Sequence, residues 1–271
     1  MISIDIADIL FTFYDLSHTV CAFLQQKYKS YIVLSPKRKS DLLLTIKCLG
    51  RKTLVYANQL KIGATIENDK YILNIHCENQ FFGAATLNLL DKTCFIELMD
   101  YNEEALDLLI SIIWRMASVL DGKILFHASA IMLDKQAILF CGHSGAGKST
   151  ILQLLRQNNL TDEMVCLYLD KSQKPMYHGI PWRNCNSNIE LPLQTIYILE
   201  KTQNIFCQDI PAEVAGMLLS KYFYFNIWVK GGRDISKYTL EDILKKVPVK
   251  KLGFNLEESE RLLNLIRGQG K

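Results

Sequence analysis

The feature that most constrains this sequence is a glycine-rich segment between an apolar run and a helix-like run. Residues 142–149 read GHSGAGKS and fit the pattern G-x-x-x-x-G-K-[ST]. AILFC at 137–141 is typical of a buried strand, and TILQLLRQ at 150–157 is typical of a helix. A strand, a glycine-rich turn and a helix in this order predict a phosphate-binding loop. The alternative is a chance match in a glycine turn, which would need neither neighbour.

Each residue type in this loop has a physical reason to be there. Gly142, Gly145 and Gly147 permit backbone angles closed to other residues, so that consecutive amides can point inward. Those amides and the positive end of the following helix form a nest for phosphates. Lys148 adds a positive charge at the β and γ phosphates, and the Ser149 hydroxyl can ligate magnesium. The candidate nucleotide-binding residues are Gly142, His143, Ser144, Gly145, Ala146, Gly147, Lys148, Ser149 and Thr150.

A bound nucleotide also needs acidic groups, and the spacing offers two candidate positions. Asp162 and Glu163 open the next apolar strand, and Asp170 closes that strand after MVCLYL. A hydrophobic strand that ends in an aspartate is typical of a Walker B acid, which favours Asp170. Asp162 and Glu163 could reach the phosphate instead if the strand ran the other way. The spacing alone leaves both positions open, and either could be a solvated strand-end carboxylate.

His127 lies one strand before the glycine-rich loop, in the run LFHASAIML. Asp134 and Lys135 form a tight turn between predicted strands at 124–133 and 136–141. In such a hairpin His127 would lie near the loop end of the neighbouring strand, beside the phosphates. The alternative is a buried core histidine with its hydrogen bonds satisfied.

The pattern of apolar and polar residues changes near residue 100. The first hundred residues are mainly short apolar or alternating runs separated by turn clusters, which predict a mainly antiparallel β part over 1–100. Strands are expected at 31–35, 42–48, 53–56, 61–66, 71–76, 81–90 and 94–99, with a strand and a helix within 9–27. Asn102 can cap a buried helix that ends at Asp121–Gly122.

Residues 101–271 alternate strands and helices, which predicts an α/β domain. Beyond the hairpin and the loop, strands are expected at 164–169, 175–178, 193–199 and 247–254, and helices at 149–157, 212–223 and 257–267.

Composition excludes several other classes of protein. Lys and Arg number 31 against 28 Asp and Glu, and a net charge of +3 is too small to indicate a nucleic-acid or membrane surface. The apolar run around Ile110 is broken by Ser111, well short of a bilayer span. Asp5 and Asp8 stand where a secretory signal would be apolar. The eight cysteines form no C-x-x-C pair, so we expect buried free thiols in a cytoplasmic protein rather than a zinc or redox site.

The ordered set of His127, the loop at 142–149, Asp162–Glu163 and the segment Gly179-Ile-Pro-Trp182 resembles the C-terminal domain of HPr kinase/phosphorylase. It is more similar still to the shorter HPr-kinase-like serine kinases found with peptide-modification clusters, including the kinases of lasso-peptide precursors. The resemblance covers residues 123–200, with weaker similarity beyond. It implies a phosphoenolpyruvate-carboxykinase-like P-loop fold with a mixed sheet, and ATP and magnesium as cofactors. HPr kinases form ring-shaped hexamers, so a homo-oligomer is compatible with the resemblance, although nothing in the sequence demands one.

The resemblance also implies roles for individual residues. It selects Asp162 and Glu163 over Asp170, with Asp162 as the base toward the acceptor hydroxyl and Glu163, together with Ser149, on the magnesium side. The family has two aspartates at this point, so the longer Glu163 is a departure. His127 matches the family's histidine close to the reacting phosphate, and the implied catalytic residues are therefore Asp162, His127 and Lys148.

The implied activity is phosphorylation of a serine hydroxyl in a peptide or protein. The signature of the phosphorylase reaction has no clear counterpart at 190–215, which argues against HPr as the substrate. Two alternatives stay open: a kinase of a small hydroxylated molecule such as free serine, and a non-catalytic ATP-sensing module. Arg183 and Arg233 are candidate catalytic arginines, although each could equally be a surface residue. Lys245, Lys246, Lys250 and Lys251 could meet an acidic peptide, but a lysine-guarded edge strand is the favoured interpretation.

Overall fold

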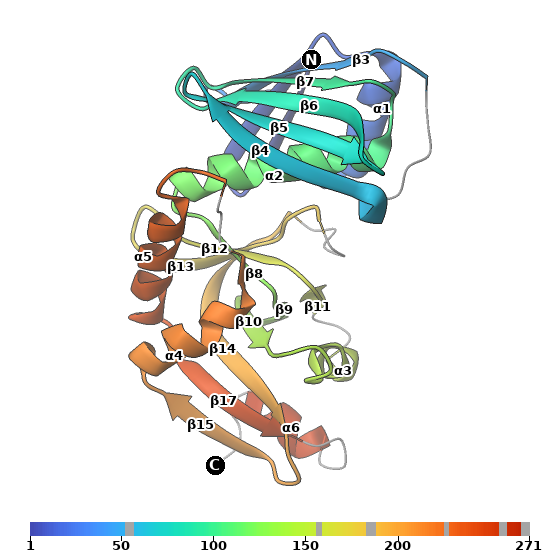
Figure 1. Cartoon of the computed structure of the whole chain (residues 1–271). Coiled ribbons are helices and arrows are strands. Elements are labelled where there is room, and N and C mark those ends of the chain that lie inside the picture. Colours follow the sequence, from blue (N-terminus) through green and yellow to red (C-terminus); the bar gives the residue numbers. More distant parts are fainter. Residues whose placement is uncertain (52–56, 156–158, 183–187, 225–227, 255–258, 267–271) are drawn as a thin grey trace. The chain divides into compact units, whose positions relative to one another are not determined.

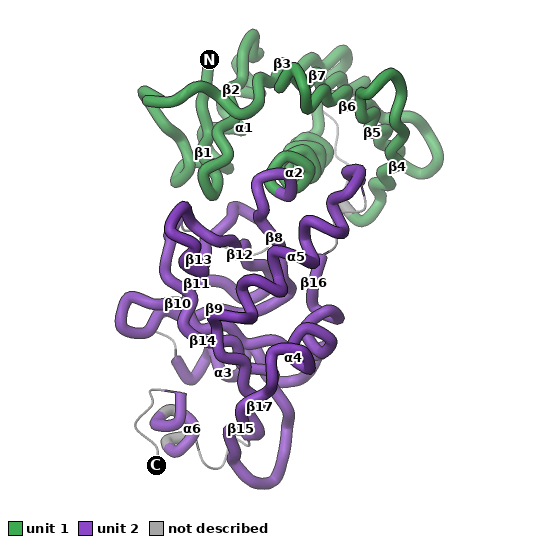
Figure 2. The backbone as a smooth tube through the Cα atoms, turned by 90° about the vertical axis from the view of Figure 1, so that its left-hand side faces the viewer, with its two compact units in different colours: residues 1–118 green, residues 119–271 purple. Residues whose placement is uncertain are grey.

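The structure is a computed structural model, and it describes residues 1–51, 57–155, 159–182, 188–224, 228–254 and 259–266. The chain divides into two compact units, Met1–Ser118 and Val119–Lys271 (Figures 1 and 2). Each unit contains a mixed sheet and helices, which confirms the predicted α/β class. None of the helices in the described part of the chain combines the length and the apolar character that a bilayer crossing requires.

Unit 1 is a sheet whose described strands follow the order β1-β2-β3-β7-β6-β5-β4. The β2–β3 and β3–β7 pairs are parallel, and the other neighbours are antiparallel. The strands are β1 Ile2–Ile6, β2 Ile9–Tyr14, β3 Leu42–Cys48, β4 Leu60–Glu67, β5 Lys70–Cys77, β6 Gln80–Asn88 and β7 Thr93–Leu98, and the helices are α1 His18–Lys27 and α2 Glu103–Leu120. The sheet is therefore mainly antiparallel, as predicted. The two parallel pairs were not predicted. α1 and the following segment return the chain to the start of β3, beside β2. The antiparallel run from β4 to β7 then brings β7 beside β3 in the same direction.

Two of the strands predicted in unit 1, at 31–35 and 53–56, are not among the strands of its described residues. Residues 31–35 were expected to form a strand, but Lys29–Tyr31 form a 3₁₀ turn and Ile32 makes only an isolated bridge to Ile4. The strand expected at 53–56 falls outside the described residues.

All but the last two residues of helix α2 belong to unit 1, because the compact units divide between Ser118 and Val119, whereas the change in sequence pattern suggested a boundary near residue 100. The indole nitrogen of Trp114 on α2 donates to the carbonyl oxygen of Ile6 at 3.0 Å. The Tyr28 hydroxyl donates to the Asp107 carboxylate on the same helix at 2.7 Å. These contacts attach α2 to β1 and to the end of α1. They join residues far apart in the chain, so the local sequence pattern could not predict them.

Unit 2 has the strand order β11-β9-β10-β14-β13-β12-β8-β16, and β17 lies between β14 and β15. The β10–β14 and β14–β17 pairs are parallel and their other neighbours are antiparallel, which gives the mixed sheet that was expected. The strands are β8 Ile124–Phe126, β9 Ser129–Leu133, β10 Gln136–Cys141, β11 Asn159–Thr161, β12 Val165–Leu169, β13 Pro175–His178, β14 Glu190–Lys201, β15 Phe206–Ile210, β16 Phe223–Tyr224 and β17 Val249–Phe254. The helices are α3 Lys148–Leu154, α4 Ala212–Leu219, α5 Gly232–Leu244 and α6 Ser259–Ile266 (Figure 1).

Helix α3 is fixed to the sheet by a shared apolar cluster. Ile151 and Leu152 on α3 belong to the same buried cluster as Phe140 on β10 and Phe254 on β17. Phe140 stacks on Tyr197 of β14, with ring centroids 5.7 Å apart. This cluster holds the strand before the glycine-rich loop and the helix after it in a fixed relation.

The cysteines of the described residues are free thiols. Cys94, Cys141 and Cys166 are buried, as expected, and the other described cysteines are partly exposed. Burial raises the pKa of Cys141 and of Cys166 to about 12. These thiols therefore behave as small apolar side chains at neutral pH.

Candidate functional site

The loop at 142–147 joins β10 to α3, as the sequence predicted. Gly147 caps α3 with a φ of 99°, in the region that favours glycine. A Cβ on Gly142 would lie 2.7 Å from the Cβ of Ala146, so the loop closes on itself only because Gly142 has no side chain. His143, Ser144 and Gly145 are exposed at the tip of the loop. The loop is therefore open to a ligand on this side.

The Lys148 side chain folds back into the loop. Its ammonium group donates to the carbonyl oxygen of Gly142 at 2.7 Å and to that of His143 at 3.3 Å. Burial lowers the pKa of Lys148, and the nearby negative charge of Asp162 opposes this shift. The ammonium group thus lies within the loop and within electrostatic reach of a carboxylate.

Strand topology brings Asp162 to the open end of this loop. β9 is antiparallel to both β10 and β11, so β10 and β11 point the same way and their carboxyl ends lie at one edge. The register pairs Phe140 with Ser129 and Thr161 with Ala130. The residue after β11 is therefore level with the residues that begin the loop.

The Asp162 carboxylate is bonded to two serine hydroxyls. Ser149, in the first turn of α3, donates to Oδ2 at 2.9 Å. Ser129, at the start of β9, donates to Oδ1 at 2.8 Å. The structure thus brings together Lys148, Ser149 and Asp162 from the predicted set. Ser129 was not predicted, although its place two residues after His127 on the neighbouring strand was visible in the sequence.

Asp170 directly follows β12, at the opposite end of that strand from Asp162. Its carboxylate accepts hydrogen bonds within the turn that joins β12 to β13. Its Oδ1 accepts hydrogen bonds from the backbone nitrogens of Ser172 and Lys174, each at 2.8 Å, and from the Ser172 hydroxyl at 2.7 Å. The Lys174 backbone bond is the largest of the contributions that lower the pKa of Asp170. This carboxylate closes the β12–β13 turn, which is the strand-end alternative considered for it above.

The structure also describes Glu163 and His127, the second acid and the histidine of the predicted set. Glu163 follows Asp162 and is half-buried. His127 is half-buried between β8 and β9, and its backbone nitrogen donates to the Tyr222 carbonyl at 2.7 Å. Its Nδ1 lies 3.4 Å from the Tyr224 hydroxyl, with the two rings edge to face. His127 is thus held by the segment that contains β16, and its partners are tyrosine groups.

The structure describes one of the two arginine candidates and all four lysine candidates. Arg183 is outside the described residues. Arg233 stands in the first turn of α5. The four lysines near β17 are paired: Lys245 with Asp242, Lys246 with the Gln173 carbonyl, Lys250 with Asp209 and Lys251 with Glu200. β17 is an inner strand, so the lysine-guarded edge strand was wrong.

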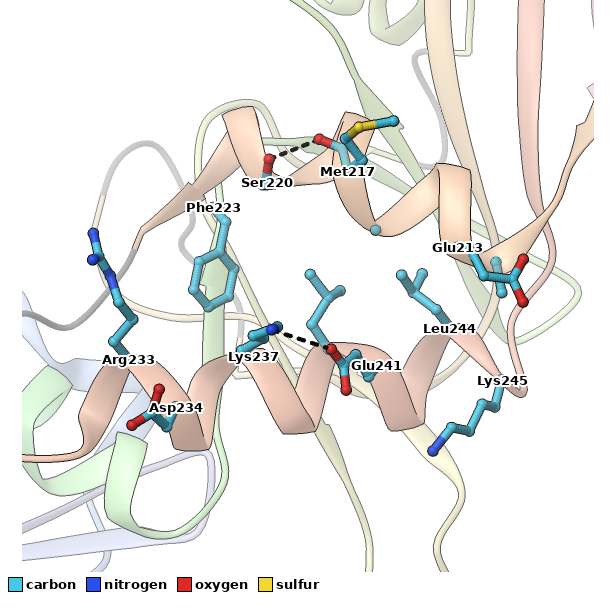
Figure 3. Close-up of a pocket in the computed structure, with 13 residues that line it drawn as sticks. Glu213, Met217, Ser220, Phe223, Arg233, Asp234, Lys237, Glu241, Leu244 and Lys245 are labelled. Atoms are coloured by element: carbon cyan, nitrogen blue, oxygen red, sulfur yellow. Dashed lines mark hydrogen bonds and ion pairs between the residues drawn. The ribbon is translucent and has the colours of Figure 1, made fainter.

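A separate groove lies between α4 and α5, with a volume of about 830 Å³. Phe223 and Leu244 point into it, and Lys237 and Glu241 form an ion pair of 3.9 Å on its α5 side (Figure 3). Of the candidate residues named from the sequence, Arg233 and Lys245 line it, and none of the residues at 142–150 or at Asp162 does. This groove is therefore distinct from the glycine-rich loop and Asp162.

No protein-family model matches the chain, and the search of curated proteins gives no match. Among solved structures, the Hpr(Ser) kinase/phosphatase from Coxiella burnetii is similar to this chain, with a TM-score of 0.30 and 14% sequence identity. The likeness covers 54% of this chain and 92% of that chain. This is a distant structural similarity.

Proposed function

We propose that unit 2 is a kinase that transfers a phosphoryl group from ATP, with magnesium, to the serine hydroxyl of a peptide or protein. The observation that carries this proposal is the hydrogen bond from Ser149 to Asp162 at the open end of the glycine-rich loop. A loop hydroxyl and a strand-end aspartate at one point are the pair that hold magnesium in P-loop nucleotide-binding proteins. The acceptor class comes from the sequence resemblance alone.

The residues at this point fit magnesium. The Ser149 hydroxyl and the Asp162 carboxylate are hard oxygen donors, which magnesium prefers. Within the described ranges, no group of three or more His, Cys, Asp and Glu side chains could hold a metal by itself. Kinase sites commonly use one or two carboxylates and complete the shell with substrate phosphates and water. When bound, the ion would neutralise charge that develops on the transferred group.

The protein groups would act by position and charge. Lys148 exchanges its bonds to the Gly142 and His143 carbonyls for bonds to phosphate oxygens. The contact with Ser149 supports Asp162 as the acid on the metal side. The resemblance gave that role to Glu163 and the acceptor proton to Asp162. With Asp162 beside Ser149, Glu163 becomes the candidate base for the acceptor hydroxyl.

Lys148→Ala tests the phosphate-binding role of the loop. We expect ATP affinity in the presence of magnesium to fall about 10- to 100-fold, because a charged hydrogen-bond donor is lost. Lys246→Ala is the matched control, since Lys246 also donates to a backbone carbonyl, that of Gln173, but away from the loop. Isothermal titration calorimetry measures the affinity, and circular dichroism checks that both variants fold.

Phosphoryl transfer is measured by mass spectrometry on a library of serine-containing peptides incubated with ATP and magnesium. We expect a gain of one phosphate on a subset of peptides, and none with Lys148→Ala. ATP binding with transfer to free serine alone would indicate a small-molecule kinase. Binding with no transfer to either acceptor would indicate a nucleotide-binding module. A chain that binds no ATP would contradict the proposal entirely.

A further inference from the structure

Ser129 is the buried one of the two serines that donate to the Asp162 carboxylate. Its side chain is 0% exposed, whereas Ser149 is exposed to solvent. The Ser129 hydroxyl lies 2.8 Å from Asp162 Oδ1 and 3.2 Å from the Asp162 carbonyl oxygen. One residue therefore contacts both the side chain and the backbone of the candidate metal-side acid.

The backbone of Ser129 is fixed by the sheet. Ser129 pairs with Phe140, which directly precedes Cys141 and the loop. The next residue of β9, Ala130, pairs with Thr161, which directly precedes Asp162. The hydroxyl of Ser129 is thus held at a point that is tied to both the loop strand and the acid's strand.

The two oxygens of the Asp162 carboxylate have different surroundings. Ser149 is bonded to Oδ2, and this exposed hydroxyl is the group that would exchange its bond for a metal ion. Ser129 is 0% exposed and is bonded to the other oxygen, Oδ1. The bond from Ser129 can therefore persist while Ser149 changes partner.

We propose that Ser129 is a positioning residue that orients the Asp162 carboxylate toward the metal-bound nucleotide. This inference rests on the proposed function and deepens it. Groups that orient metal-ligating carboxylates by hydrogen bonding are worth about 10- to 100-fold in metal affinity or activity. Ser129→Ala leaves Oδ1 without its donor, so that the carboxylate can rotate away from Ser149.

The test compares ATP binding with MgCl₂ and with EDTA. For Ser129→Ala we expect ATP affinity to fall about 10- to 100-fold with MgCl₂ and to stay within about twofold of wild type with EDTA. Ser129→Thr keeps the hydroxyl in a residue that suits a strand, and it should retain most of the magnesium-dependent affinity. Ser3→Ala in unit 1 is the matched control, because it also removes a buried serine bond, the 3.0 Å contact with Thr12.

A double-mutant cycle separates positioning from a general loss of structure. If Ser129 acts through Asp162, Ser129→Ala should cause no further loss of magnesium-dependent affinity in an Asp162→Ala background. Equal losses with and without Asp162 would overturn the inference, as would a Ser129→Ala variant that binds ATP and magnesium like wild type. If the wild-type chain binds no ATP, the proposed function fails and this inference fails with it. If wild type binds and only the Ser129 results disagree, this inference fails alone.

Discussion

Gly147→Ala tests whether the loop depends on glycine where it enters α3. Gly147 has a φ of 99°, and holding another residue in such a sparsely populated conformation costs about 1–3 kcal/mol. A Cβ at this position would lie 2.3 Å from Cζ of Phe254, and overpacking of a core costs about 1–3 kcal/mol more. The expected loss of unfolding free energy is therefore about 2–6 kcal/mol, a large part of the 5–15 kcal/mol or so that stabilises a typical domain.

Gly145→Ala is the matched control for this prediction. Gly145 also has a positive φ, of 80°, but a Cβ there would meet no atom within 4 Å. It should cost only the backbone strain, about 1–2 kcal/mol. Urea unfolding of the full chain, followed by circular dichroism, measures the free energy of unfolding of each variant.

A second-site change isolates the contact with Phe254. Gly147→Ala combined with Phe254→Leu should be less destabilised than the sum of the two single variants, because the shorter side chain relieves the clash. Equal losses in the Gly147→Ala and Gly145→Ala variants would refute the role given to Phe254. Strict additivity of Gly147→Ala and Phe254→Leu would refute it as well.

Two further predictions concern the acids and the buried thiols. Asp162→Asn should lower magnesium-dependent ATP affinity about 10- to 100-fold, whereas Asp170→Asn should leave it unchanged in the same calorimetric titration; the opposite pattern would return the metal-side role to Asp170. Alkaline pH should destabilise unit 2, because burial raises the pKa of Cys141 and Cys166 to about 12 while thiols of an unfolded chain ionise near pH 8.5 or so. The folded chain then retains protons that the unfolded chain releases, so the unfolding free energy falls as the pH rises from about 9 toward 12. Urea titrations across this range should show a shallower fall for Cys141→Ala/Cys166→Ala, and an unchanged fall would contradict the assignment.

The parts of the fold that could be predicted from the sequence depend on local chemistry. Asn102 was expected to cap α2, and its Oδ1 accepts from the Ala105 backbone nitrogen at 2.8 Å. Asp134 and Lys135 were expected to form a tight turn, and both adopt positive φ, 49° and 61°. The strand, loop and helix around Gly147 could be predicted for the same reason, because each sequence signal lies within a few residues of the structure that it produces.

Helix α5 was missed for a reason that is also local. Its start, KGGRD, reads as a flexible turn, and Gly231 does cap the helix with a φ of 75°. The buried positions of α5 include Ser236, Leu240 and Leu244, one turn apart. Ser236 and the surrounding charged residues interrupt the apolar periodicity expected of an amphipathic helix. The helix is therefore recognised only from its packing against α4 and the sheet.

The choice between Asp162 and Asp170 could not be made from spacing, because it depends on how separate strands align. LFHASAIML reads as one continuous strand, yet the structure breaks it into β8 and β9 around His127 and Ala128. The opposing strand breaks at the same level: pairing ends at Thr161–Ala130 and resumes at Val165–Phe126.

This shared break is what creates the site. Backbone groups that leave a sheet need other partners, and side-chain hydroxyls supply them: Thr161 donates to the Met164 carbonyl at 3.4 Å and Ser129 contacts the Asp162 carbonyl at 3.2 Å. With the ladder interrupted, the Asp162 side chain reaches the Ser149 hydroxyl instead of following the regular alternation of a strand. Had the two strands paired without a break, Asp162 would be one more residue of a regular ladder. The Ser129 hydroxyl has one proton, which the Asp162 carboxylate at 2.8 Å and the Asp162 carbonyl at 3.2 Å share, so the folding requirement and the proposed chemistry depend on the same donor.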